Sequence, residues 1–150
     1  MKQYIGTKII NAEPAYRVDG KVFVKSQPVP CGYKVEDGYK VVYSPDGYES
    51  WSPKDVFEAA YRETTGMSFG LAIEAAKMGK KIARAGWNGK NQYVELASCI
   101  SYTNAAGETI NCNHEAIGNK ALAFVGTSGV QMGWLASQAD MLADDWMIVE

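Results

Sequence analysis

The 150-residue sequence has few of the side chains on which catalytic and metal sites depend. It contains one histidine, His114, and three cysteines, which form no C-x-x-C pair. It has no H-E-x-x-H motif and no glycine-rich loop that could hold a phosphate. We therefore expect no hydrolytic enzyme. An odd number of unpaired cysteines indicates reduced thiols in a reducing compartment, where we expect them to fill small buried positions.

The sequence also lacks a surplus of positive charge and any long apolar run. Lysine and arginine total 15 against 17 aspartates and glutamates, which gives a formal charge of −2. Without a basic surplus, DNA and RNA are poor partners. No eighteen apolar residues run together, and the start MKQYIGTKII has no apolar signal segment. We expect a soluble cytoplasmic protein that does not bind membranes.

Residues 1–66 have the pattern of a small α+β module. We expect strands over the β-prone runs 4–10, 22–24, 39–43 and 48–51, with a Ser-Pro-Asp-Gly turn before the last of them. Ser52 followed by Pro53 is typical of a helix start, and the helix is expected to run to about Tyr61. Thr64-Thr65-Gly66 ends this helix, so we place the domain boundary after residue 66.

Residues 67–150 predict a second module built on a largely antiparallel sheet. A helix is expected from Ser68 to Gly79, because its apolar residues recur at helical spacing. Hairpins follow at 81–96, 100–111 and 122–135, and the first of them displays Trp87 beside the Asn88-Gly89 turn. Ser137 starts a short helix before a last strand at 146–149. The predicted fold class is α+β, with this domain preceded by the smaller α+β module.

Two groups of side chains could be drawn as metal sites. Zinc on Cys99, Cys112 and His114 is not expected, because structural zinc ligands come in close pairs and no fourth ligand is evident. Asp140 and Asp144 either hold magnesium at a helix end or serve as a cap and a solvated charge. Both interpretations remain open for these two residues, whereas Asp145 is expected to be a solvated charge.

The tryptophans are the other candidates for function. Trp87 lies beside Gly86 and Trp134 beside Gly133, where a side chain can stand clear of a sheet and stack on a nucleobase. The alternative is that both fill the core. We favour stacking for Trp87, leave both roles open for Trp134 and Trp146, and assign Trp51 to packing.

Two separated motifs in the second module resemble a known family. They are GKKIARAGWNGK at 79–90 and GWLASQADMLADDW at 133–146, preceded by MSFGLA at 67–72. The stretch 67–150 resembles the second type of phage Thoeris anti-defence protein. The first 66 residues resemble a short module of other phage proteins.

The resemblance implies a sponge that captures cyclic ADP-ribose isomers, among them glycocyclic ADP-ribose, without cleaving them. Such binding would block a suicide response in the infected bacterium. It also implies a homotetramer with pockets where protomers meet, no cofactor, and in some members binding of cyclic dinucleotides from a second defence system, CBASS.

By the first motif, the resemblance implies that Trp87 stacks on the adenine. Asn88 and the nearby turn amides would meet ribose or phosphate oxygens. Arg84 would supply positive charge to the pyrophosphate.

By the second motif, Trp134 would form a wall of the pocket. Ser137 and Asp140 would place a hydroxyl and a carboxylate against the ribose or the base edge. Such a pocket binds by stacking and a few convergent polar groups.

Two other functions remain open from the sequence. One is a hydrolase of the signal, in which Asp140 and Asp144 hold magnesium. The other is a structural or host-interaction module in which the tryptophans only pack.

Overall fold

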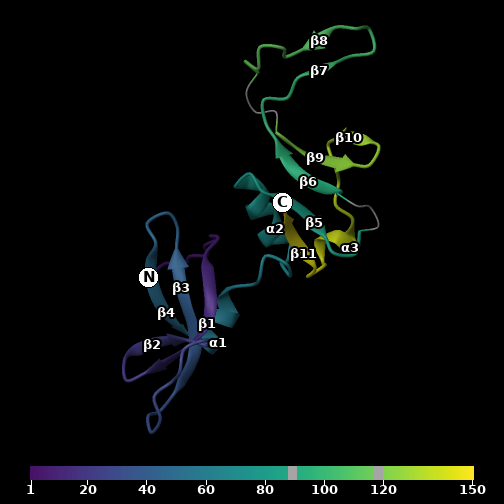
Figure 1. The fold of residues 1–150 in the computed structure, drawn as a ribbon. Helices are drawn as coiled ribbons and strands as arrows, with labels where there is room; N and C mark the ends of the chain where they lie inside the picture. Colours follow the sequence, from purple (N-terminus) through teal and green to yellow (C-terminus); the bar gives the residue numbers. More distant parts are fainter. Residues whose placement is uncertain (88–90, 117–119) are drawn as a thin grey trace. The chain divides into compact units, whose positions relative to one another are not determined.

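The computed structural model describes residues 1–87, 91–116 and 120–150. The chain divides into two compact units, Met1–Arg62 and Glu63–Glu150, each with its own sheet (Figure 1). Residues 64–67 belong to the second unit because their backbone hydrogen-bonds to its last strand: Ile148 donates to Thr64, and Met67 exchanges two bonds with Trp146. The first unit ends at Arg62, four residues before position 66. No helix in the described part of the chain is long and apolar enough to cross a membrane.

The first unit is a four-stranded antiparallel sheet with one short helix. Its elements are β1 (Asn11–Val18), β2 (Lys21–Val24), β3 (Glu36–Tyr43), β4 (Tyr48–Pro53) and α1 (Lys54–Ala60), and the strand order is β2-β1-β3-β4. Helix α1 covers one face through Phe57, whose ring stacks on Tyr39 with centroids 4.0 Å apart. The predicted hairpin at Ser44–Gly47 is confirmed, since Tyr43 pairs with Tyr48.

Two local predictions for this unit are wrong. Residues 4–10 form no strand, because β3 already ends at Tyr43, next to the partner of Asn11, and leaves them nothing to pair with. The ladder starts instead at β1, which contains Pro14. Pro14 is tolerated because β2 pairs only with Ala15–Val18, so one side of the strand is open at the proline. Ser52 does not cap α1, because it is still paired in β4 with Tyr39, and Pro53 precedes the helix without a side-chain cap.

Trp51 packs in this unit, as expected, and lies across Gly38. A Cβ atom added to Gly38 would lie 2.3 Å from the Ser52 carbonyl oxygen and 2.5 Å from Trp51 Cη2. We expect Gly38→Ala to lower the free energy of unfolding of the unit by about 1–3 kcal/mol, because such crowding forces a strand or the indole to move. Chemical denaturation measures the loss. Gly6→Ala is the control, since nothing lies within 4 Å of its added Cβ; equal stability of the two variants would contradict the prediction.

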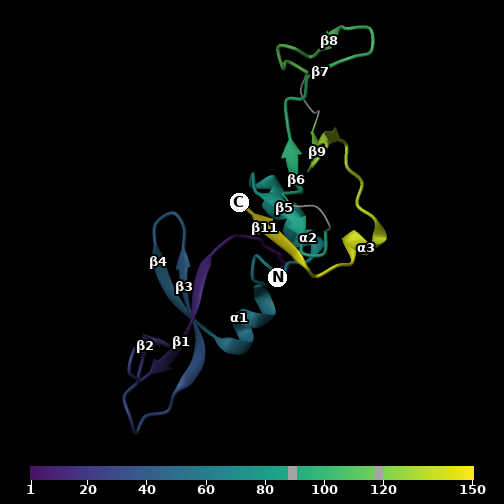
Figure 2. The same cartoon turned by 45° about the vertical axis from the view of Figure 1, so that its right-hand side comes forward.

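The second unit is a five-stranded antiparallel sheet with a helix on one face. Its elements are α2 (Phe69–Lys77), β5 (Lys81–Arg84), β6 (Tyr93–Ala97), β7 (Tyr102–Thr103), β8 (Thr109–Ile110), β9 (Ala121–Gly126), β10 (Gly129–Met132), α3 (Gln138–Met141) and β11 (Trp146–Val149). The strand order is β10-β9-β6-β5-β11. Strands β7 and β8 form a separate hairpin in the segment of chain that connects β6 to β9 (Figures 1 and 2). The predicted α+β class is confirmed.

Local signals define the ends of α2 as the sequence predicted. The Ser68 side chain accepts a hydrogen bond from the Leu71 amide at the start, and Gly79 takes a left-handed conformation, φ 88°, after the end. The small residues of the helix allow close approach to the sheet. The core cluster of buried residues contains Met67, Ala72, Ala75, Ala76, Ile82, Val94 and Trp146.

Candidate functional site

The two motifs meet through their tryptophans. Trp87 follows β5 and Trp134 follows β10, and their rings lie edge to face with centroids 6.0 Å apart and planes at 69°. Both also contact the ring of Trp146, at 5.5 Å and 6.1 Å. We call Trp87, Phe124, Trp134 and Trp146 the aromatic cluster.

The sequence suggested that Trp87 stands clear of the sheet. In the structure its side chain is half-buried. Its ring lies edge to face on Phe124, with centroids 5.6 Å apart, because the pairing of β6 with β9 places Phe124 opposite Val94 at the centre of the covered face. Trp146 has no exposed surface and is a core residue, which settles a role that the sequence left open. The aromatic cluster therefore joins the core to the segments that carry the two motifs.

A polar network lies beside the aromatic cluster. Arg84, the last residue of β5, donates from Nε to Asp145 Oδ1 at 2.9 Å and from Nη1 to Asp140 Oδ1 at 3.0 Å. The Arg84 and Asp140 side chains are largely shielded, with 23% and 15% of their surface exposed. We call Arg84, Asp140 and Asp145 the carboxylate clamp.

The second oxygen of Asp140 is also engaged. Oδ2 accepts from the Ser137 amide at 3.0 Å and from the Ser137 hydroxyl at 2.9 Å, while Ser137 Oγ accepts from the Asp140 amide. These bonds form a capping box at the helix start that the sequence predicted, and they fix the first turn of α3. The Asp140 carbonyl accepts from the Trp146 indole at 2.8 Å, so α3 is tied to the aromatic cluster.

The clamp holds its groups in their charged forms. Burial alone would raise the pKa of Asp140, but hydrogen bonds from Ser137 and Arg84 outweigh it and the pKa is lowered. The hydrogen bond from Arg84 lowers the pKa of Asp145 against the opposing effect of burial. The two carboxylates in turn raise the pKa of Arg84.

These pKa directions predict an acid-sensitive C-terminal unit. Carboxyls with a folded pKa below their ordinary 3.8 bind protons less readily than the unfolded chain does, so their stabilisation is present above that value and lost as the pH falls through the folded pKa. We expect the urea midpoint of this unit to be level above roughly pH 5 and to fall below 3.8. Asp145→Asn should fall less steeply, and an equally steep fall in this variant would contradict the assignment.

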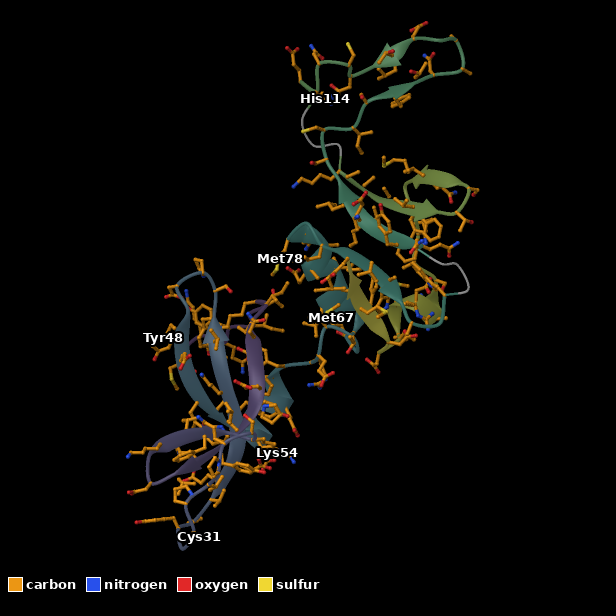
Figure 3. All side chains as sticks on the ribbon, viewed as in Figure 1. Cys31, Tyr48, Lys54, Met67, Met78 and His114 are labelled. Carbon is orange, nitrogen blue, oxygen red and sulfur yellow. The ribbon has the colours of Figure 1, made fainter. Side chains whose placement is uncertain are left out.

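The alternative metal sites are not assembled in the described residues. No group of three histidine, cysteine, aspartate or glutamate side chains gathers there in a way that could hold a metal ion. Asp144 is exposed, while both oxygens of Asp140 are engaged in the network described above. His114 lies just after the hairpin of β7 and β8 (Figure 3), and its Nδ1 donates to the Cys99 carbonyl.

The three cysteines are free and exposed, so the prediction that they fill buried positions is wrong. All of them lie in connecting segments. Cys31 is in the loop between β2 and β3 (Figure 3), and Cys99 and Cys112 flank the small hairpin, where no core is available to cover them.

A further enzyme-like motif lies at the start of the second unit. Residues 66–70 read Gly-Met-Ser-Phe-Gly and match the G-x-S-x-G pattern of serine nucleophiles. In the structure Ser68 is the N-cap of α2, and its Oγ accepts from the Leu71 amide at 3.4 Å. Its surroundings therefore assign it a structural role.

Five of the six residues proposed from the motifs come together in the second unit. Trp87 and Trp134 share the aromatic cluster, and Arg84, Ser137 and Asp140 share the network. Asn88, the sixth, lies outside the described residues. Asp145, taken from the sequence as a solvated charge, belongs to the network, and only the pairing of Trp146 with Arg84 between β11 and β5 reveals it.

The same part of the chain matches known proteins. A model of the Thoeris anti-defense 2-like domain matches residues 67–149. Thoeris anti-defense 2 of Bacillus phage SP01 is 40% identical over 90 residues, which cover 57% of this chain and 97% of that protein. Both likenesses rest on more than half of the chain, and the protein therefore belongs to the Thoeris anti-defense 2-like family.

Proposed function

We propose that the protein is a phage anti-defence sponge that binds glycocyclic ADP-ribose and holds it intact. Membership of the family supports the anti-defence role. The observation that carries the proposal of a ligand site is that Trp87 and Trp134, 47 residues apart in the sequence, lie in ring contact. Two indoles at the ends of strands, beside a polar network, suit a ligand that combines a base with ribose and phosphate groups.

Binding would use the flat face of an indole and polar groups around it. The adenine would stack on Trp87, with Trp134 as the adjoining wall, and Asn88 with the turn amides would meet ribose or phosphate oxygens. Backbone amides can offset negative charge without a lysine or arginine. A nanomolar dissociation constant corresponds to about −12 kcal/mol, which stacking and several hydrogen bonds in a water-poor site can supply.

A second copy of the chain would complete the site. Large apolar side chains are exposed on the segments that carry it: Leu135, next to Trp134, is 90% exposed, and Leu142, at the end of α3, is 78% exposed. Exposed apolar side chains can form the contiguous apolar patch that marks an interaction site. We propose a homotetramer with ligand pockets between protomers, and the same pockets or others would accept cyclic dinucleotides.

The first experiment is retention and release. The purified protein is incubated with glycocyclic ADP-ribose, separated from free ligand and denatured by heat, and the released nucleotide is identified by mass spectrometry. Recovery of intact ligand at one per protomer, or one per two protomers, supports the sponge. A cleaved product would instead support a hydrolase, and no retained nucleotide would reject glycocyclic ADP-ribose as the ligand.

A further inference from the structure

The carboxylate clamp raises the question of what Arg84 does. The family motif suggested that its charge meets a pyrophosphate, yet two of its nitrogens already donate to carboxylates at 2.9 and 3.0 Å. The clamp carries one positive and two negative charges, and the lowered pKa values of both carboxyls keep them ionised at neutral pH. The two carboxylates therefore neutralise the guanidinium, which leaves it no net positive charge to offer a phosphate.

The clamp also links the two segments that carry the tryptophans. Arg84 precedes Trp87 by three residues, and the Trp87 amide donates to the Arg84 carbonyl. On the other side, Asp140 is tied by the capping box to Ser137, three residues after Trp134. The Arg84 side chain thus connects the turn that follows β5 to helix α3.

Backbone bonds make the link stiff. The Ala85 amide donates to the Asp145 carbonyl at 3.1 Å, and the next residue, Trp146, pairs with Arg84 in the ladder between β11 and β5. The Trp146 indole donates to the Asp140 carbonyl. A displacement of Arg84 would therefore move the aromatic cluster through three connections: its backbone bond to Trp87, its ladder pairing with Trp146, and Asp140.

We propose that Arg84 is a positioning residue, which sets the mutual geometry of Trp87 and Trp134 through Asp140 and Asp145 and does not bind the ligand's phosphates. The role rests on the proposed function of the site as a nucleotide sponge. Binding energy is gained when recognition groups are held in place before the ligand arrives. Lysine cannot replace the planar guanidinium, because it lacks the fork that reaches two carboxylates at once.

Asp145→Asn separates the two roles by the sign of its effect. If Arg84 bound phosphate, removing one of the competing carboxylates would free its charge and tighten binding of glycocyclic ADP-ribose. If Arg84 positions the tryptophans, the same change weakens the clamp and loosens binding. We expect a loss of about tenfold in affinity for Arg84→Gln, a smaller loss for Asp145→Asn, and no flattening of the slope of affinity against salt concentration in Arg84→Gln.

Isothermal titration calorimetry of the full chain at several salt concentrations measures these affinities. Arg17→Gln is the matched control, because Arg17 pairs with Glu36 on the exposed surface of the other unit. Arg84→Lys should bind as poorly as Arg84→Gln. Tighter binding by Asp145→Asn, or a flatter salt slope in Arg84→Gln, would overturn the positioning role.

The geometry can be tested without ligand, so that failure of the sponge and failure of the clamp are told apart. Near-ultraviolet circular dichroism of the free protein reports the packing of the tryptophans. We expect Arg84→Gln and Asp145→Asn to change this spectrum with the far-ultraviolet spectrum intact; Asp145→Asn serves if Arg84→Gln does not fold. An unchanged tryptophan spectrum in both variants would overturn the clamp, whereas absence of ligand binding by the unaltered protein would overturn only the proposed function.

Discussion

Under the proposed function, replacing Trp87 with alanine is expected to weaken binding of glycocyclic ADP-ribose by about 5- to 150-fold. Loss of a stacked aromatic ring costs about 1–3 kcal/mol per base, and each 1.4 kcal/mol is a factor of about ten in affinity. The indole also packs edge to face on Phe124, Trp134 and Trp146, so the variant loses some stability as well. Calorimetric titration measures the affinity at a temperature where circular dichroism shows the chain to be folded.

Two controls distinguish stacking from packing at Trp87. Trp87→Phe keeps a flat ring and should retain most of the affinity. Trp51→Phe changes a tryptophan of the other unit, which packs over Gly38, and should bind like the unaltered protein. If Trp87→Ala bound the ligand with full affinity, Trp87 would be a packing residue and the stacking role would be lost.

Trp146→Ala should have the largest effect on stability of any single change in the second unit. The side chain has no exposed surface, its ring lies 5.4 Å from Phe69, and its indole donates to Asp140. Truncating a buried tryptophan costs about 3–5 kcal/mol, against a total of about 5–15 kcal/mol for a typical domain. We expect the C-terminal unit to unfold at a much lower urea concentration, or not to fold at all.

The matched change Trp146→Phe tests the two parts of that loss. It keeps an aromatic ring in the core but removes the hydrogen bond to the Asp140 carbonyl, and we expect it to be intermediate in stability. Denaturation followed by circular dichroism gives both values. A loss below about 1 kcal/mol for Trp146→Ala would show that the site had closed around the cavity, which these close contacts do not allow.

Local sequence signals predicted the elements that local contacts define. The Ser68 cap, the Gly79 stop and the Ser137 capping box each involve residues within four positions of one another, and each is found where expected. The predicted strand over residues 4–10 and the predicted helix start at Ser52 were wrong, because whether a strand forms depends on a partner far along the chain.

The motifs identified residues that lie together in the structure, but not the contacts among them. Arg84 and Asp145 are separated by 61 positions, and only the register of β5 with β11 brings them together. A motif marks residue types without showing whether a charge is already neutralised. The resemblance implies that Arg84 meets the ligand's phosphates, whereas the structure shows its guanidinium paired with Asp140 and Asp145.

The arrangement of the tryptophans also gives the protein an optical property. Three of the four indoles lie in mutual ring contact in the second unit, with centroids 5.5–6.1 Å apart, whereas Trp51 belongs to the first unit. Excitation of any one of the three passes readily to its neighbours at such separations. A base that quenches Trp87 would therefore dim the emission of all three, whereas Trp51 lies outside this group of rings. Under the proposed function, the chain would report its own occupancy in ultraviolet light without an attached dye.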